Sequence, residues 1–269
     1  MPTEQLPPVG LGTMRYETSD DCVQSVQTAL EMGYRHIDTA QKYENEAEVG
    51  QGIAESDVPR SDVFLATKVA EPNLAHDDVL DSVEESLDKL AVDQVDMLYV
   101  HWPAPKYDAE ETLSAFNELL GQDAMRHVGL ANFSPDLLDE AREILDVEPL
   151  AVQVEMHPLC QQPELHEYVQ EHDMYLVAYC PLMRGEIFDV PELSEIADDA
   201  GISPSELSLA WLCSKDHVIP IPKATGEAHL RENFAASEIE VDQATLERVD
   251  AIDRTRRVVD PPTKAPWNW

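Results

Sequence analysis

Residues 33–50, which read Gly-Tyr-Arg-His-Ile-Asp-Thr-Ala-Gln-Lys-Tyr-Glu-Asn-Glu-Ala-Glu-Val-Gly, decide the fold. A short apolar strand in this stretch ends in Asp38, and a helix begins soon afterwards. Aspartate is a poor strand residue, but the carboxyl ends of strands are where packed α/β proteins carry their chemistry. Tyr43 follows five residues after Asp38. We therefore expect a functional site at this strand end.

The next two predicted strands also end in a titratable residue. Lys68 closes the apolar run 63–67, and His101 closes the run 95–100. The carboxyl ends of parallel strands meet at one edge of the sheet. These two side chains are therefore expected to join Asp38.

Strand-like apolar runs alternate with amphipathic helical patterns along the chain. The predicted strands are 6–12, the strand ending at 38, 63–68, 95–100, 125–131, 150–154, 175–179 and 218–221. The predicted helices are 20–32, 47–56, 77–90, 110–120, 135–145, 163–172, 191–200, 204–213, 228–236 and 243–252. Eight strand candidates separated by helices predict an α/β fold with a closed parallel (β/α)8 TIM barrel.

No Pro-, Gly- or Ser-rich linker divides the sequence, so residues 1–269 are predicted to form a single barrel domain. Residues 258–269 contain three prolines and two tryptophans. We expect this tail to be irregular and to lie over the surface or over the barrel mouth.

The charge balance is extreme, because 18 Lys and Arg face 54 Asp and Glu and give a net charge of −36. Such a surface repels nucleic acid and anionic membranes, so neither is expected as a partner. The acidic residues are spread over predicted helices, and lysine is scarce. This composition is similar to that of salt-adapted, halophilic proteins, whose carboxylates are screened over ~3 Å at 1 M salt.

The four cysteines are far apart and form no CxxC pair, so neither a zinc site nor a disulfide framework is expected. No metal-ligand set is apparent. No segment approaches the ~20 apolar residues of a membrane span, and the polar start lacks the features of a signal peptide. We expect a cytoplasmic protein.

The stretch 33–50 resembles the long first signature of the aldo-keto reductase superfamily, and the motifs described below extend this resemblance over nearly the whole chain. The resemblance implies a barrel that reduces carbonyl groups with a nicotinamide cofactor. It also implies a catalytic tetrad, whose members in this sequence are Asp38, Tyr43, Lys68 and His101.

The four residue types suit carbonyl reduction, which needs a hydride donor to carbon and a proton donor to oxygen. Tyrosine ionises near pH ~10. The Lys68 cation can stabilise tyrosinate and make Tyr43 a better acid, while Asp38 holds Lys68 charged. His101 can donate a hydrogen bond that positions the carbonyl.

Each of these residues also has a structural reading when it is taken singly. Asp38 and Lys68 could form a purely structural ion pair. Tyr43 could be an ordinary aromatic residue at a helix start, and His101 a buried histidine with satisfied hydrogen bonds. Within one matched signature, the catalytic reading is preferred.

No GxGxxG motif opens a helix after a strand, so a Rossmann dinucleotide site is not supported. The resemblance instead places the cofactor on the barrel loops. On the side of the nicotinamide and pyrophosphate it implies contacts from Thr13, Asp38, Asn132, Gln153, Tyr179, Cys180 and Leu182. Ala131 replaces a usual serine, and Cys180 stands where serine is common.

The segment from Ile221 to Asn233 resembles the part of the family that binds the adenosine 2′-phosphate. The implied contacts are Lys223, Ala224, His229, Glu232 and Asn233. Ala224 replaces the phosphate-binding serine, and His229 stands where arginine is usual. We expect NADPH, because Lys223 and the nearby helix start suit an anion, with NADH as a second possible cofactor.

The resemblance implies that Met14, His101 and Trp102 contact the substrate. Met14 replaces a common tryptophan, and Trp102 could instead be a core anchor. Bacterial members that act on keto-sugar acids or methylglyoxal look most similar, so we expect a small carbonyl substrate and a monomer. A sugar or polyol dehydrogenase and a non-catalytic nicotinamide-binding redox sensor remain alternatives.

Overall fold

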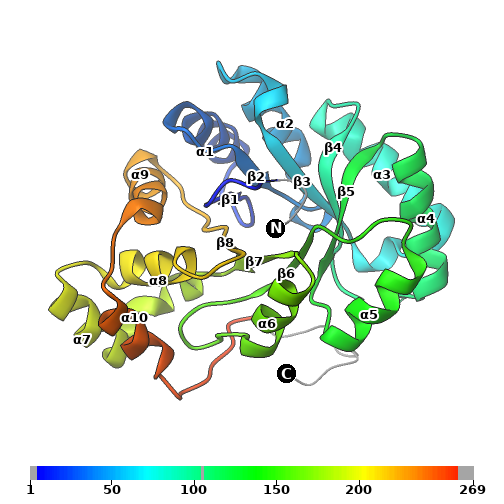
Figure 1. Ribbon diagram of the computed structural model, residues 1–269. Helices are drawn as coiled ribbons and strands as arrows, with labels where there is room; N and C mark the ends of the chain where they lie inside the picture. Colours follow the sequence, from blue (N-terminus) through cyan, green and yellow to red (C-terminus); the bar gives the residue numbers. More distant parts are fainter. Residues whose placement is uncertain (1–4, 104–105, 260–269) are drawn as a thin grey trace.

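The computed structural model describes residues 5–103 and 106–259. Its centre is one eight-stranded parallel sheet in which the strands follow one another in chain order (Figure 1). The strands are β1 (Leu11–Gly12), β2 (His36–Asp38), β3 (Phe64–Val69), β4 (Val95–Val100), β5 (Met125–Ala131), β6 (Ala151–Glu155), β7 (Tyr175–Tyr179) and β8 (Val218–Pro220).

The sheet closes on itself through backbone hydrogen bonds between its two ends. The N–H of Gly10 donates to the carbonyl of Pro220 at 3.0 Å, and the N–H of Gly12 donates to that of Pro222 at 3.2 Å. The last strand therefore pairs with the first, and the predicted (β/α)8 barrel is confirmed.

Helices surround the strands on the outside of the barrel (Figure 1). They are α1 (Ser19–Met32), α2 (Glu46–Glu55), α3 (His76–Leu90), α4 (Ala109–Gly121), α5 (Pro135–Ile144), α6 (Pro163–Glu171), α7 (Pro191–Ala200), α8 (Pro204–Cys213), α9 (Glu227–Ala235) and α10 (Gln243–Asp250). The ends of α1 show why they form there. The Thr18 side chain accepts from the N–H of Asp21 at 3.1 Å, and Gly33 ends the helix with a φ of 119°.

The first strand is much shorter than the sequence predicted. The expected strand 6–12 is reduced to Leu11–Gly12. Pro7 and Pro8 lack the N–H that a paired strand needs. Leu6, just before them, is instead buried against the barrel interior, where its N–H donates to the Tyr175 hydroxyl at 3.4 Å.

The core has two parts. The larger part lies between strands and helices and the smaller part fills the barrel, where Tyr99, Val177 and Ile219 pack together. Asp38, at the carboxyl end of β2, is also buried. The barrel interior therefore changes from apolar to charged toward the end where the predicted site lies.

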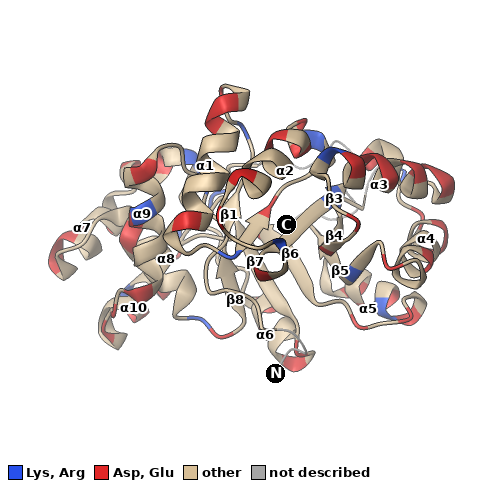
Figure 2. Ribbon diagram, turned by 90° about the horizontal axis from the view of Figure 1, so that it is seen from above, with Lys and Arg blue, Asp and Glu red and all other residues tan. Residues whose placement is uncertain are grey.

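Acidic residues are spread along the outer helices, and basic residues are sparse among them (Figure 2). This distribution agrees with the predicted spread of carboxylates over helices. In the described part of the chain, no helix has the length and apolar character needed to cross a membrane.

Gly50, the last residue of the quoted stretch, marks a close contact between α2 and α3. A Cβ added there would lie 2.4 Å from the backbone oxygen of Leu90. A backbone atom cannot move aside as the end of a flexible side chain can. Glycine at this position therefore allows the two helices to pack together.

We expect Gly50→Ala to destabilise the fold by about 1–3 kcal/mol, because overpacking forces a backbone shift. For a chain of this size the midpoint of thermal unfolding should fall by roughly 3–10 °C. Gly121→Ala is the matched control, since a Cβ added there meets nothing within 4 Å. Equal unfolding midpoints for the two variants would contradict the expectation.

Candidate active site

A buried ion pair lies at the centre of the site. The Lys68 ammonium on β3 donates to Oδ1 of Asp38 at the end of β2, and both side chains are 1% exposed. The ammonium also donates to the Thr39 carbonyl at 2.6 Å. The amide of Gln153 on β6 donates to the second oxygen of Asp38 at 2.7 Å. Strands from two sides of the barrel thus meet at one carboxylate.

Opposing effects act on the Lys68 ammonium. Burial lowers the pKa of Lys68, because an apolar surrounding disfavours the cation. The Asp38 carboxylate raises it, through its charge and through the hydrogen bond. The carboxylate is therefore what favours the charged form of this lysine inside the barrel.

Tyr43 lies beside this pair, at the end of the short helix η1 (Gln41–Tyr43). The Lys68 Nζ is 5.2 Å from the centroid of the Tyr43 ring. Unlike the buried pair, Tyr43 is partly exposed. Its ring can therefore be reached from the barrel mouth.

Burial and the Asp38 charge act on the Tyr43 phenol in addition to the predicted effect of Lys68. We expected the Lys68 cation to make this phenol more acidic. In the structure the pKa of Tyr43 lies well above its usual value of 10, because burial and then the Asp38 charge disfavour tyrosinate. The Lys68 ammonium is already engaged by Asp38 and Thr39. The phenol therefore holds its proton at neutral pH.

His101 follows β4 directly and faces Tyr43. The two rings stand edge to face with centroids 5.8 Å apart and an interplanar angle of 84°. Burial, followed by the charges of Lys68 and Lys42, holds the pKa of His101 well below 6.5. Its Nδ1 has no hydrogen-bond partner among the described residues. His101 is therefore a neutral imidazole with one N–H to donate.

An amide network joins β5, β6 and β7 next to the tetrad residues. Asn132 has a φ of 63°, and its N–H donates to the Gln153 carbonyl at 2.8 Å. Its side-chain amide donates to the His101 carbonyl at 2.9 Å. The Tyr179 hydroxyl donates to the Asn132 side-chain oxygen at 2.8 Å. These contacts fix the Tyr179 ring, which is partly exposed at the end of β7.

The residues after β1 complete this side of the mouth. Thr13 is fully buried, and its hydroxyl donates to the Asp38 carbonyl at 3.0 Å. Its own carbonyl accepts from the Asn45 amide at 2.8 Å. Met14 is partly buried, and Trp102 is buried. Thr13 therefore holds the Asp38 backbone in place.

The predicted phosphate residues form a second group, in the loop after β8 and on α9. Lys223 is partly exposed, and its Nζ lies 4.5 Å from the centroid of the Tyr16 ring. The Tyr16 hydroxyl donates to the Ala224 carbonyl at 3.3 Å. His229 and Glu232 are exposed, whereas Ala224 and Asn233 are buried. Cys180 and Leu182, after β7, are partly exposed.

Glu46 supports the site without any role having been predicted for it. Its carboxylate is buried and accepts hydrogen bonds from Thr67 at 2.6 Å and from Ser86 at 3.2 Å. Gln41, at the start of η1, donates to Ser86 and accepts from the N–H of Ala70. These bonds fix η1, and therefore Tyr43, against β3 and α3.

Two further contributors were missed by the sequence analysis. The Thr39 carbonyl accepts from Lys68, and a backbone acceptor leaves no trace in residue types. Glu155 ends β6 and is fully buried. An acidic residue at the end of an apolar strand is the same signal that singled out Asp38, so Glu155 could have been found.

Comparisons with known proteins place the chain among barrel oxidoreductases. The sequence profile of the Aldo/keto reductase family matches residues 8–254. Methylglyoxal reductase DkgB of Escherichia coli O157:H7 is 35% identical over 264 residues, which cover 97% of this chain and 98% of the relative. The chain belongs to the Aldo/keto reductase family.

Solved structures agree with this assignment. A crystal structure described as a putative 2,5-diketo-D-gluconic acid reductase B has a TM-score of 0.92 and 36% identity, covering 98% of this chain and 94% of that chain. An aldo-keto reductase of Bombyx mori in complex with NADP has a TM-score of 0.88 and 28% identity, covering 96% and 92%.

We expect Asp38→Asn to unfold far more easily than wild type, because it leaves the Lys68 cation buried without its counter-charge. Removing one partner of a buried pair costs about 3–5 kcal/mol, so the unfolding midpoint should fall by roughly 10 °C. Glu227→Gln serves as the control, since its pair with Arg231 is exposed at 69% and 66%. Similar shifts in the two variants would show that the Asp38 pair does not hold the fold.

Proposed function

We propose that this protein reduces small aldehydes or ketones to alcohols with NADPH, and that Tyr43 is the proton donor. The observation that supports this proposal most directly is the set of side chains around the Tyr43 hydroxyl-bearing ring. A protonated phenol lies at the barrel mouth beside the buried Lys68 ammonium. A neutral His101 faces it from the end of β4.

A nicotinamide cofactor held against Tyr179 and Asn132 would supply the hydride for the carbonyl carbon. His101 donates a hydrogen bond to the carbonyl oxygen and fixes its orientation. As negative charge develops on that oxygen, the Tyr43 hydroxyl gives it a proton. The Lys68 cation then stabilises the resulting tyrosinate, while Asp38 keeps Lys68 charged and in place. A phenol with a raised pKa keeps its proton until the oxygen becomes basic enough to take it.

The donor groups of the site suit a nicotinamide dinucleotide. Tyr179 has its hydroxyl fixed by Asn132 while its ring remains partly exposed, so the ring can stack on a planar group. Asn132 bonds to Tyr179 and Gln153 bonds to Asp38, and both carry amides of the kind that can bind a carboxamide. Lys223 is a partly exposed cation that could hold a phosphate.

We favour NADPH because of Lys223, and the NADP complex of the Bombyx mori relative supports this choice. Two residues weaken the preference. Ala224 is buried and offers no hydroxyl, and His229 replaces a permanently charged arginine. We therefore expect NADH to be used as well, with lower affinity.

The substrate we propose is a small 2-oxoaldehyde or a keto-sugar acid. The names of a methylglyoxal reductase and of a 2,5-diketo-D-gluconic acid reductase among similar proteins support this class. Met14 stands at the mouth where the resemblance would place an aromatic residue. A flexible thioether adapts to small substrates of varied shape.

We expect wild type to oxidise NADPH when methylglyoxal or a keto-sugar acid is added in molar KCl, and Tyr43→Phe to lose at least about 100-fold in kcat. The phenylalanine keeps the ring and removes only the proton donor. Nicotinamide absorbance gives turnover for NADPH and NADH, and fluorescence titration gives cofactor affinity.

Unchanged cofactor affinity in Tyr43→Phe is the internal control of that comparison. Undiminished turnover in this variant would rule out the proton-donor role. Cofactor binding without any turnover in wild type would rule out the reductase itself. Equal affinity for NADPH and NADH would overturn the preference for NADPH.

We also propose that the protein is adapted to high salt. Its net charge of −36 creates strong self-repulsion. Acidic residues recur along the outer helices, where basic residues are sparse (Figure 2). Salt screens this repulsion, since the Debye length falls from ~10 Å at 0.1 M to ~3 Å at 1 M.

The unfolding midpoint should therefore rise steeply between about 0.05 M and 2 M KCl, measured by circular dichroism. A charge-neutral osmolyte at matched osmolality is the control, because it does not screen charge. An unchanged midpoint and full activity in about 0.05 M salt would refute salt adaptation.

A further inference from the structure

Glu155 is a buried carboxylate that the proposed mechanism does not use. It ends β6 and its side chain is fully buried. Burying a charged carboxylate is unfavourable unless hydrogen bonds satisfy its oxygens. The hydrogen-bond partners of Glu155 therefore indicate the role of this residue.

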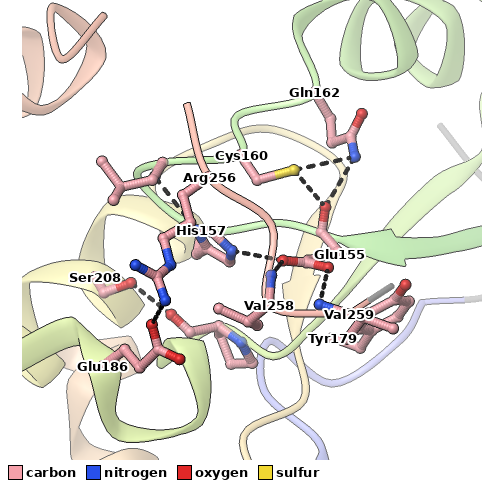
Figure 3. Close-up of polar contacts among 12 residues, drawn as sticks. Glu155, His157, Cys160, Gln162, Tyr179, Glu186, Ser208, Arg256, Val258 and Val259 are labelled. Atoms are coloured by element: carbon pink, nitrogen blue, oxygen red, sulfur yellow. Dashed lines mark hydrogen bonds and ion pairs between the residues drawn. The ribbon is translucent and has the colours of Figure 1, made fainter. Parts of the chain in front are cut away.

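The partners of Glu155 come from the far end of the described chain. The N–H of Val258 donates to Oε1 at 2.6 Å, and the N–H of Val259 donates to Oε2 at 3.1 Å. His157 also bonds to Oε1, at 2.9 Å. Figure 3 shows the carboxylate between His157 and these two backbone groups. Each oxygen of the carboxylate thus accepts a hydrogen bond from one of these two backbone N–H groups.

Other contacts fasten the same segment, which we call the C-terminal segment (residues 254–259). The N–H of Arg256 donates to the Leu159 carbonyl at 2.8 Å. The Arg256 guanidinium pairs with Glu186 in the short helix η4 (Met183–Asp189), which follows β7 (Figure 3). Arg254 lies 3.5 Å from Glu192. The segment therefore bridges the loops that follow β6 and β7.

Glu155 is also a neighbour of the candidate active site. It pairs in register with Tyr179 on β7. It lies two residues after Gln153, so the two side chains share one face of the strand, and Gln153 contacts Asp38. Burial and then the Glu155 charge raise the pKa of the Tyr179 phenol. One carboxylate thus contacts the C-terminal segment and influences Tyr179.

We propose that Glu155 is a positioning residue that holds the C-terminal segment at the barrel mouth beside Tyr179, so that the segment forms part of the wall around the bound substrate. The hydrogen bonds from two backbone N–H groups to a carboxylate are strong, since the acceptor is charged. The two N–H groups offset the cost of burying the carboxylate, and the carboxylate in turn holds the C-terminal segment against the end of β6. The kinetic consequence rests on the proposed carbonyl reduction, whereas the anchoring does not.

Two substitutions in the full-length chain remove the anchor from opposite sides. Glu155→Gln keeps the shape but presents an amide NH2 to one of the backbone donors. Val258→Pro removes the N–H that reaches Oε1. Trypsin reports the state of the segment without any turnover, because it cleaves after Arg254, Arg256 and Arg257 once this stretch detaches.

We expect each variant to be cleaved in this segment about tenfold faster than wild type. With NADPH and methylglyoxal in molar KCl, KM should rise about tenfold while kcat changes less than about twofold. The double variant should resemble either single variant, because both remove one interaction. A purely structural role would lower the unfolding midpoint and leave KM unchanged.

Two controls accompany the experiment. Val258→Ala keeps the backbone donor and should resist trypsin as wild type does. Asp96→Asn removes a buried carboxylate that accepts from Leu65 and pairs with Arg60, away from the C-terminal segment. It should leave KM unchanged even if it lowers the unfolding midpoint.

The proposal is overturned if either folded anchor variant keeps wild-type cleavage and KM, or if their effects multiply in the double variant. Should Glu155→Gln fail to fold, Val258→Pro decides the outcome alone. If wild type turns over no carbonyl substrate, the reductase proposal fails, and the cleavage rates still confirm or overturn the anchoring.

Discussion

The rest of the site depends on the buried ion pair between Asp38 and Lys68. A lone ammonium in the barrel interior would be strongly disfavoured, and burial alone lowers the pKa of Lys68. The Asp38 carboxylate stabilises the cation there. Gln153 adds a hydrogen bond to Asp38, and the Thr39 carbonyl accepts a second one from Lys68. The hydrogen bonds of this ion pair therefore connect the ends of β2, β3 and β6 and keep the Lys68 ammonium next to Tyr43.

The environment of this pair sets the protonation of its neighbours. Tyr43 and His101 are both kept neutral by burial and by the charges of Asp38 and Lys68. A neutral phenol can give a proton, and a neutral imidazole can donate a hydrogen bond without competing for that proton. Burying the charges of Asp38 and Lys68 costs stability, but the same charges keep Tyr43 and His101 neutral, as their proposed roles require. The contacts of Asp38 and Lys68 therefore bear on both the stability of the fold and the proposed function.

The barrel, and the meeting of Asp38, Lys68 and His101 at one end of it, were predictable because their signals are local. Parallel strands buried on both faces read as apolar runs, and a charged residue ending such a run stands out, as Lys68 does. The failures have physical reasons. The first strand shrinks because prolines remove its hydrogen-bond donors. Strand β3 runs one residue beyond Lys68, because Val69 pairs with Val100.

The sequence by itself determined the alternation of strands and helices, the candidate proton donor, the charged pair and the histidine that follow the strands, and the excess of negative charge. These properties follow from residue type and from spacing along the chain. Only the tertiary structure decided that burial and the Asp38 charge act on the pKa of Tyr43, and that Glu155 binds the backbone of Val258. A pKa and a long-range hydrogen bond depend on which groups share a buried space, and closing the barrel creates that space.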